Sequence, residues 1–137
     1  MEGKRRKARE TVLKLLYSFE LNPKTPEAAI EDYCQLNGIK SIDSFTTKHF
    51  LGIVKEKDKI DQYIKTYVRN WKIERIALID KNIMRIAIHE MLAMPDIPRV
   101  VSINEAVDIA KKYSTKDSGK FVNGILDKIN KDLPLQT

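Results

Sequence analysis

The stretch IALIDKNIMRIAIHEMLAM, residues 76–94, decides the fold of this 137-residue chain. Its apolar residues cover most of the circumference of a helix, while Asn82, Arg85 and His89 occupy one narrow strip. A helix that is apolar around most of its surface has to be surrounded by other elements. The stretch therefore predicts a central helix on which the rest of the chain packs.

Helical periodicity continues toward the N-terminus. Apolar residues spaced three and four apart predict helices over about 4–21 and 26–36, and a helical region over 45–68. The polar run 55–59 leaves open whether that region is one long helix or two.

Capping residues support these divisions. Thr25 and Pro26 are typical of a helix start, Gly38 can adopt the left-handed conformation that ends a helix, and Ser41 or Asp43 can cap the next one. The boundaries therefore agree with the periodicity.

Beyond the central helix, Pro95 and Pro98 break the pattern, and Ser102-Ile103-Asn104-Glu105 matches a capping box that predicts a helix start at Ser102. Residues 115–119 are predicted to form the loop before the last helix. Gly124 lies inside that helix, where Gly costs about 1 kcal/mol relative to Ala, so it suggests a close approach of two backbones.

These segments together predict an all-α, single-domain helical bundle over 1–137, with a basic arm, residues 1–10, leading into the first helix. No stretch shows the sustained alternation of a strand. Cys34 is the only cysteine and is expected to be a buried thiol. No apolar run approaches the roughly 18 residues of a membrane span, and no targeting signal is visible, so we expect a cytoplasmic protein without membrane contact.

The arm holds half of the net charge. It carries five basic residues against Glu2 and Glu10, a surplus of three within a total of +6. Such a cluster attracts polyanions, of which nucleic acid is the commonest in a cytosol. A solvated basic face without a partner is the alternative.

Groups that would support catalysis are missing from the pattern. His49 and His89 lie far apart in the sequence, outside any metal or triad spacing, and each is expected to be structural. No phosphate-binding Gly-rich loop or nucleophile turn is present. We therefore expect a binding protein that is not an enzyme and needs no cofactor or metal.

Tyr67 offers a flat ring in a basic setting, with Lys65, Arg69 and Lys72 nearby. Recognition of single-stranded RNA needs such rings for unstacked bases. The alternative is an aromatic at a helix end, packed half into the core.

Four blocks of the sequence, in order and over nearly the whole chain, resemble the NusB family. They are RKARE (6–10) with Leu16-Tyr17, WKIERI (71–76), IDKNIMRIAIHEM (79–91), and VSINEAV (101–107) with AKKY (110–113) and KFVNGILDK (120–128). The resemblance implies a fold of about seven helices that binds boxA RNA of rRNA leader transcripts as a heterodimer with NusE, a small-subunit ribosomal protein. The pair would join RNA polymerase and other Nus factors to suppress termination.

The resemblance also implies site residues, matched position by position. Those expected to bind RNA are Arg5, Arg6, Arg9, Tyr67, Lys120 and Asp117, the last as an acid that opposes phosphate. The charge of the arm adds Lys4 and Lys7 to this group. Those expected on or near the NusE surface are Tyr17, Asp80 and Phe121. No residue is expected to be catalytic.

Two other functions remain open at this point. Some rRNA cytosine methyltransferases carry a similar N-terminal domain, but this chain ends after that domain, so we expect no catalytic part. A helical scaffold that binds only protein would leave the arm without a role in RNA binding. The sequence also leaves open whether the free protein is a monomer or a homodimer.

Overall fold

The computed structural model describes residues 2–68 and 72–134, and over them it forms seven α-helices and one short 3-10 turn. In chain order these are α1 (Glu2–Leu21), α2 (Pro26–Asn37), α3 (Ser44–Lys55), α4 (Lys57–Tyr67), η1 (Ile73–Arg75), α5 (Leu78–Ala93), α6 (Arg99–Tyr113) and α7 (Lys116–Asp132). The predicted all-α fold is confirmed. None of the described helices is both long and apolar enough to cross a membrane.

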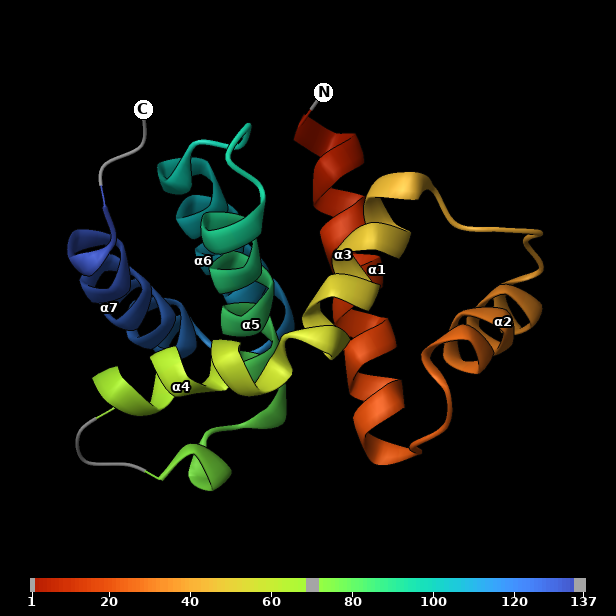
Figure 1. Ribbon diagram of the computed structural model, residues 1–137, viewed down its shortest axis with the longest axis horizontal. Coiled ribbons are helices and arrows are strands. Elements are labelled where there is room, and N and C mark those ends of the chain that lie inside the picture. The colour runs from red at the N-terminus through yellow and green to blue at the C-terminus, as the bar shows by residue number, and fades with distance from the viewer. Residues whose placement is uncertain (1, 69–71, 135–137) are drawn as a thin grey trace.

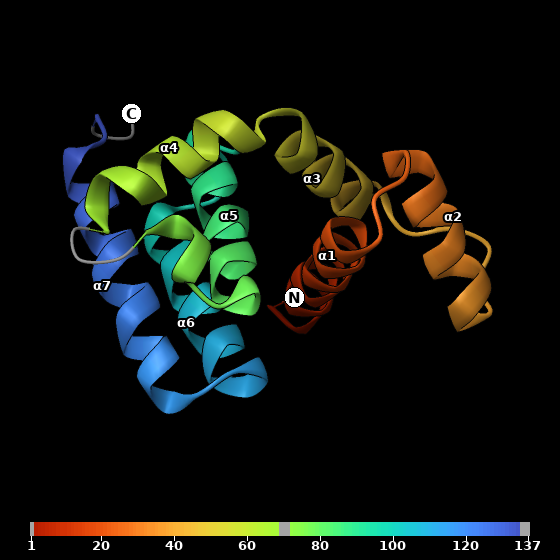
Figure 2. The same cartoon turned by 90° about the horizontal axis from the view of Figure 1, so that it is seen from below.

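Helix α5 lies at the centre, as its sequence predicted. It contacts α1 and α3 on one side and α4, α6 and α7 on the other, while α2 packs on α1 at the outer edge (Figures 1 and 2). Every residue from Asn82 to Met91 is buried, including the polar ones. The core side chains of the other helices, such as Phe50 and Leu126, are also fully enclosed.

Local signals account for most helix boundaries. The hydroxyl of Thr25 accepts a hydrogen bond from the Ala28 amide at 3.1 Å, and Gly38 ends α2 with a φ of 65°. Asp43, rather than Ser41, caps α3. The region 45–68 is two helices, because the chain leaves the helical path at Glu56 within the polar run.

The predicted start of α6 is wrong. The helix begins at Arg99, directly after Pro98, so Ser102 and Glu105 lie inside it and are both buried. The spacing i, i+3 that makes a capping box also places two side chains on one helix face. That face is turned toward α1 and α5, where both side chains have other partners.

The predicted loop 115–119 is also wrong, because α7 begins at Lys116. The hydroxyl of Thr115 accepts a hydrogen bond from the Ser118 amide at 3.0 Å and caps the helix. Asp117 and Lys120 therefore lie on the first two turns of a helix, and both are exposed.

The close backbone approach expected at Gly124 is not found; a tight glycine contact occurs at Gly52, where a side chain of α5 lies against the backbone of α3. A Cβ on Gly124 would meet no atom within 4 Å, whereas one on Gly52 would lie 2.5 Å from Cε1 of His89. The His89 ring fills the space that a side chain at position 52 would need. Gly52 thus allows α3 to pack against α5.

We expect Gly52→Ala to lower the free energy of unfolding by about 1–3 kcal/mol, the usual cost of overpacking. The buried His89 ring cannot move freely, since it packs on His49 with 5.0 Å between ring centroids. Urea denaturation followed by circular dichroism measures the effect. The matched control is Gly124→Ala, which we expect to stabilise α7 by up to about 1 kcal/mol. Equal effects at both positions would contradict the packing argument.

Candidate nucleic-acid interface

The N-terminal half of α1 presents two different sides. One side, with Arg6, Arg9 and Glu10, faces α5 and α6. The Arg6 guanidinium donates to both carboxylate oxygens of Glu105 at 2.6 Å and to Asp108 at 3.0 Å. This two-pronged pairing raises the pKa of Arg6 and fixes its side chain against α6.

Arg9 lies inside the protein, only 3% exposed. Its Nε and Nη2 donate to the two oxygens of Glu90 at 2.7 and 2.9 Å, and Nη1 donates to Glu105 at 3.3 Å. The guanidinium is therefore used within the fold and does not face solvent. The expected RNA contact of Arg9 stays untested, while its position shows that it ties α1 to α5 and α6.

Glu90 is the centre of this buried network. Besides Arg9, its carboxylate accepts hydrogen bonds from the Ser102 hydroxyl at 2.6 Å and pairs with His49 Nε2 at 2.8 Å. Burial by itself raises the pKa of Glu90, but the hydrogen bonds from His49 and Arg9 outweigh it and hold the pKa at about 2. The carboxylate thus stays ionised and keeps three helices in register with α5.

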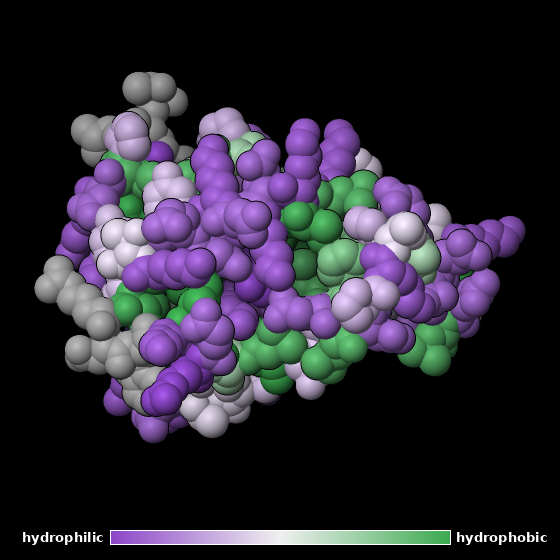
Figure 3. Space-filling view, turned by 60° about the horizontal axis from the view of Figure 1, so that its bottom comes forward, coloured by the Kyte–Doolittle hydropathy of each residue, from purple (hydrophilic) through white to green (hydrophobic). Residues whose placement is uncertain are grey.

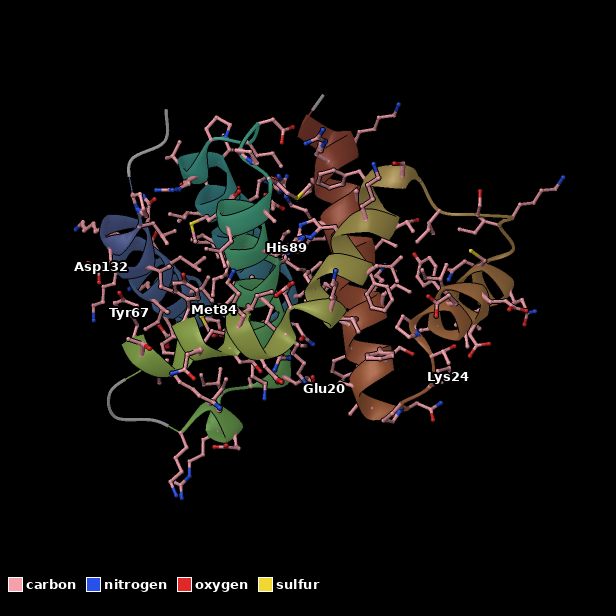
Figure 4. All side chains as sticks on the ribbon, viewed as in Figure 1. Glu20, Lys24, Tyr67, Met84, His89 and Asp132 are labelled. Atoms are coloured by element: carbon pink, nitrogen blue, oxygen red, sulfur yellow. The ribbon has the colours of Figure 1, made fainter. Side chains whose placement is uncertain are left out.

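The two histidines, distant in sequence, meet beside this network. Their rings lie 5.0 Å apart between α3 and α5, and Figure 4 shows His89 in the middle of the molecule. Within residues 2–68 and 72–134, no group of three or more His, Cys, Asp or Glu side chains is arranged to hold a metal. Both rings are buried in the core, and their purely structural role stays a prediction.

The other side of the arm is exposed and cationic. Lys4, Arg5 and Lys7 all face solvent, and none of them has an acidic partner among the described residues. The Arg5 guanidinium lies over the Phe45 ring, 4.2 Å from its centroid. This side of α1, held rigidly by the pairing on its opposite side, offers three charges that phosphates can engage.

Tyr67 lies away from this cationic side. Figure 4 places it beside Asp132 in the part of the molecule formed by α4 and α7, whereas α1 begins at the far upper edge (Figure 1). Its hydroxyl donates to Asp132, which raises the pKa of Tyr67, and its ring packs partly on the core. Arg69 and Trp71 lie outside the described residues. RNA contact by Tyr67 stays a prediction.

A second surface joins three of the predicted residues. Asp80, Asp117 and Phe121 line one hollow of about 360 Å³ where the start of α5 meets the start of α7. Asp80 Oδ2 accepts a hydrogen bond from Ser118 at 2.9 Å, while its buried Oδ1 has no partner among the described residues. Lys120 is exposed nearby on α7, and Tyr17 is exposed on α1, outside the lining of the hollow.

Sequence reasoning missed the carboxylates of the buried network. Glu90 and Glu105 each fit a helix pattern in which an acid is unremarkable, and their arginine partners on α1 lie 81 to 99 residues away. The available signal was the acid at position 90 within a helix that is otherwise mostly apolar, because a charge buried there has to be paired. Figure 3 shows a face of the molecule that is mostly hydrophilic, with several apolar groups exposed between the hydrophilic side chains.

Comparisons with known proteins agree with this geometry. A family model described as the NusB family matches residues 6–131. The transcription antitermination protein NusB of Thermodesulfovibrio yellowstonii is 46% identical over 140 residues, which cover 94% of this chain and 93% of that protein. The protein of that name from Bacillus licheniformis is 40% identical and covers 95% and 98%.

Solved structures extend the likeness to three dimensions. The structure of T. maritima NusB matches with a TM-score of 0.81 at 36% identity and covers 93% of this chain and 91% of that one. A structure of antitermination factors NusB and NusE in complex with dsRNA matches with a TM-score of 0.84 at 27% identity and covers 97% and 100%.

Proposed function

Because the chain belongs to the NusB family, we propose that it is a transcription antitermination protein that binds boxA RNA of rRNA leader transcripts together with NusE. The family resemblance seen in the sequence is confirmed, and so is the expectation of a protein that is not an enzyme. In this proposal the complex of RNA, NusE and this chain joins RNA polymerase and other Nus factors in the cytoplasm.

The observation that carries the RNA part of the proposal is the exposed side of α1. Lys4, Arg5 and Lys7 project from a helix whose opposite side is fixed by Arg6 and Arg9. Phosphate contacts of this kind supply most of the affinity of a basic surface for RNA. Arg6 and Arg9 then act by holding the helix, and the solved neighbour that contains RNA supports the general role.

The NusE part rests on the hollow between α5 and α7. Asp80 Oδ1 is a buried acceptor without a partner among the described residues, and Phe121 offers part of its ring beside it. A partner that donates an N–H and packs an apolar side chain here would satisfy both groups. We propose this hollow, with Tyr17 at a separate contact, as the NusE surface. Asp117 also lines it and Lys120 is exposed nearby, and RNA contact by these two residues stays a prediction.

We expect the three exposed cations to set the salt dependence of RNA binding. Each phosphate contact to a single strand contributes roughly −0.7 to the slope of log affinity against log salt, so three contacts give about −2 and all five arm residues about −3.5. The unaltered protein should then bind roughly 20-fold more tightly near 50 mM salt than near 200 mM, and changing Lys4, Arg5 and Lys7 to Ala should abolish most of this slope and of this difference. Fluorescence anisotropy with a labelled boxA-like RNA measures both.

The matched control removes equal charge elsewhere, with Lys55, Lys59 and Lys128 changed to Ala; all three are exposed and lie outside the arm. A scrambled RNA, and added NusE, test whether the binding depends on sequence and partner. Binding of neither RNA by the unaltered protein, with or without NusE, would favour the scaffold that binds only protein. If the slope of log affinity against log salt were unchanged in the arm variant, RNA would have to bind somewhere other than α1.

A further inference from the structure

We propose that the hollow between α1 and the α2–α3 connection is a nucleotide subsite, in which Lys4 and Lys7 hold a phosphate and the ring of Tyr33 stacks on an unpaired base. The inference rests on the proposed RNA-binding function and specifies where one nucleotide of the strand lies. Neither the family pattern nor the sequence singled out Tyr33.

The hollow brings the free charges and the ring together. It has a volume of about 280 Å³ and is lined by Lys4 and Lys7 from α1, Tyr33 from α2, and Ile39 and Ile42 from the connection. Lys4 and Lys7 are three positions apart, which places both side chains on one face of the helix. Both are exposed and without an acidic partner among the described residues.

The wall opposite the lysines is suited to a flat apolar group. Tyr33 is half-buried, so its ring position is fixed by packing while part of it stays open to solvent. Ile39 is 43% exposed and, together with Ile42, gives this wall an apolar surface. An apolar wall beside a pair of cations matches the two parts of a nucleotide, the base and its phosphate.

Charges on the remaining wall restrict how the nucleotide can lie. The Asp43 carboxylate also lines the hollow, and it accepts a hydrogen bond from the Thr46 amide at 2.7 Å as the cap of α3. An acid repels phosphate, so the phosphate has to lie on the α1 side and the base toward α2 and the connection. Arg5, stacked on Phe45, extends the cationic side onto α3 and gives the neighbouring nucleotide a planar group.

The size of the hollow favours a single strand over a duplex. Its volume is near the lower limit of about 300 Å³ for small-molecule pockets, enough for one unstacked base and not for a base pair. Bases become available for stacking only where a strand is unpaired. In this proposal, therefore, single-stranded RNA binds at this face of α1 and duplex RNA does not.

The test uses the full chain and a single-stranded boxA-like RNA in which 4-thiouridine replaces uridine at one position at a time. Irradiation followed by mass spectrometry of the peptides locates the base. We expect a crosslink to the peptide that contains Tyr33 from one or two adjacent positions. Crosslinks confined to peptides elsewhere, such as the one that contains Tyr67, would overturn the proposal.

Variants separate the subsite from the arm as a whole. Tyr33→Leu should weaken single-strand binding roughly 5- to 150-fold, the effect of losing one base-stacking contact, and leave the salt slope unchanged. Lys7→Gln should reduce the slope by about 0.7. Tyr63→Leu is the matched control, because Tyr63 on α4 is half-buried like Tyr33 and lies outside the lining of the hollow; it should leave RNA binding unchanged.

The outcomes distinguish this inference from the proposed function. If the unaltered protein binds no RNA, both fail. If it binds RNA and Tyr33→Leu, shown by circular dichroism to be folded, binds as tightly, only the subsite fails. If Tyr33→Leu does not fold, the crosslink map of the unaltered protein and the slope of Lys7→Gln still decide, because neither needs that variant.

Discussion

Replacing Glu90 with Ala is expected to lower the free energy of unfolding by about 3–5 kcal/mol, the cost of removing one partner from a buried ion pair. Glu90 is 1% exposed, and Arg9, which it neutralises, is 3% exposed. Without the carboxylate, the guanidinium and the Ser102 hydroxyl lose their acceptor in a region that water does not reach. The remaining contact of Arg9 with Glu105, at 3.3 Å, is too long to compensate.

Urea denaturation of the variant and the unaltered protein measures this loss. Glu31→Ala, on the exposed surface of α2, is the matched control and should change the free energy of unfolding by less than about 0.5 kcal/mol. A double variant with Arg9→Met and Glu90→Leu should be more stable than Glu90→Ala, since it leaves no unpaired charge in the core. If Glu90→Ala cost no more than the control, the network would not be holding the helices together.

The same network connects stability with the proposed function. Glu90 and Glu105 fix one side of α1 through Arg9 and Arg6, and this leaves Lys4, Arg5 and Lys7 directed outward on a helix that cannot turn. Cations on a fixed helix bind a strand with less loss of conformational freedom than cations on a disordered arm. The basic residues of the arm therefore fall into two groups according to their positions in the helix. Arg6 and Arg9 fix the helix, and the other three face solvent.

The sequence predicted those features that depend on neighbouring residues. The apolar circumference of 76–94 specified the central helix, and Thr25, Gly38 and Asp43 act within a few residues of the boundaries that they set. Ser102 and Glu105 misled because their spacing fits both a helix cap and a helix face, and only the position of Glu90 across the interface decides between the two.

The same limit applies to the candidate site. The charge of the arm was visible in the sequence, but which of its residues face solvent depends on Glu90 and Glu105, which lie far along the chain. Tyr33 had no signal of its own, because its proximity to Lys4 and Lys7 arises only when α2 folds back on α1. Asp80 and Phe121 were placed on one surface through the family resemblance, and the structure brings them to one hollow.

Acidification should destabilise the protein through His89 before Glu90 is protonated. Burial, reinforced by the nearby His49, lowers the pKa of His89 from 6.5 to about 4, although the charge of Glu90 acts in the opposite direction. At pH values between about 4 and 6.5, His89 binds a proton in the unfolded chain but not in the native protein. Stability is therefore complete above pH 6.5 and falls as the pH drops toward 4, by about 1.4 kcal/mol per unit and about 3 kcal/mol in all.

The window from pH 6.5 to 5 excludes a contribution of Glu90, because the pKa of Glu90 is held at about 2 and its own loss of stability begins only below its ordinary value of 4.5. Over that window we expect urea denaturation to show a loss of about 2 kcal/mol from His89 in the unaltered protein. His89→Gln removes this contribution, so its stability, lower at pH 7 because of altered packing, should fall by about 2 kcal/mol less. Parallel pH profiles for the two proteins would mean that His89 takes up its proton as readily when folded as when unfolded, and that the ring is not enclosed between Gly52 and His49 in solution.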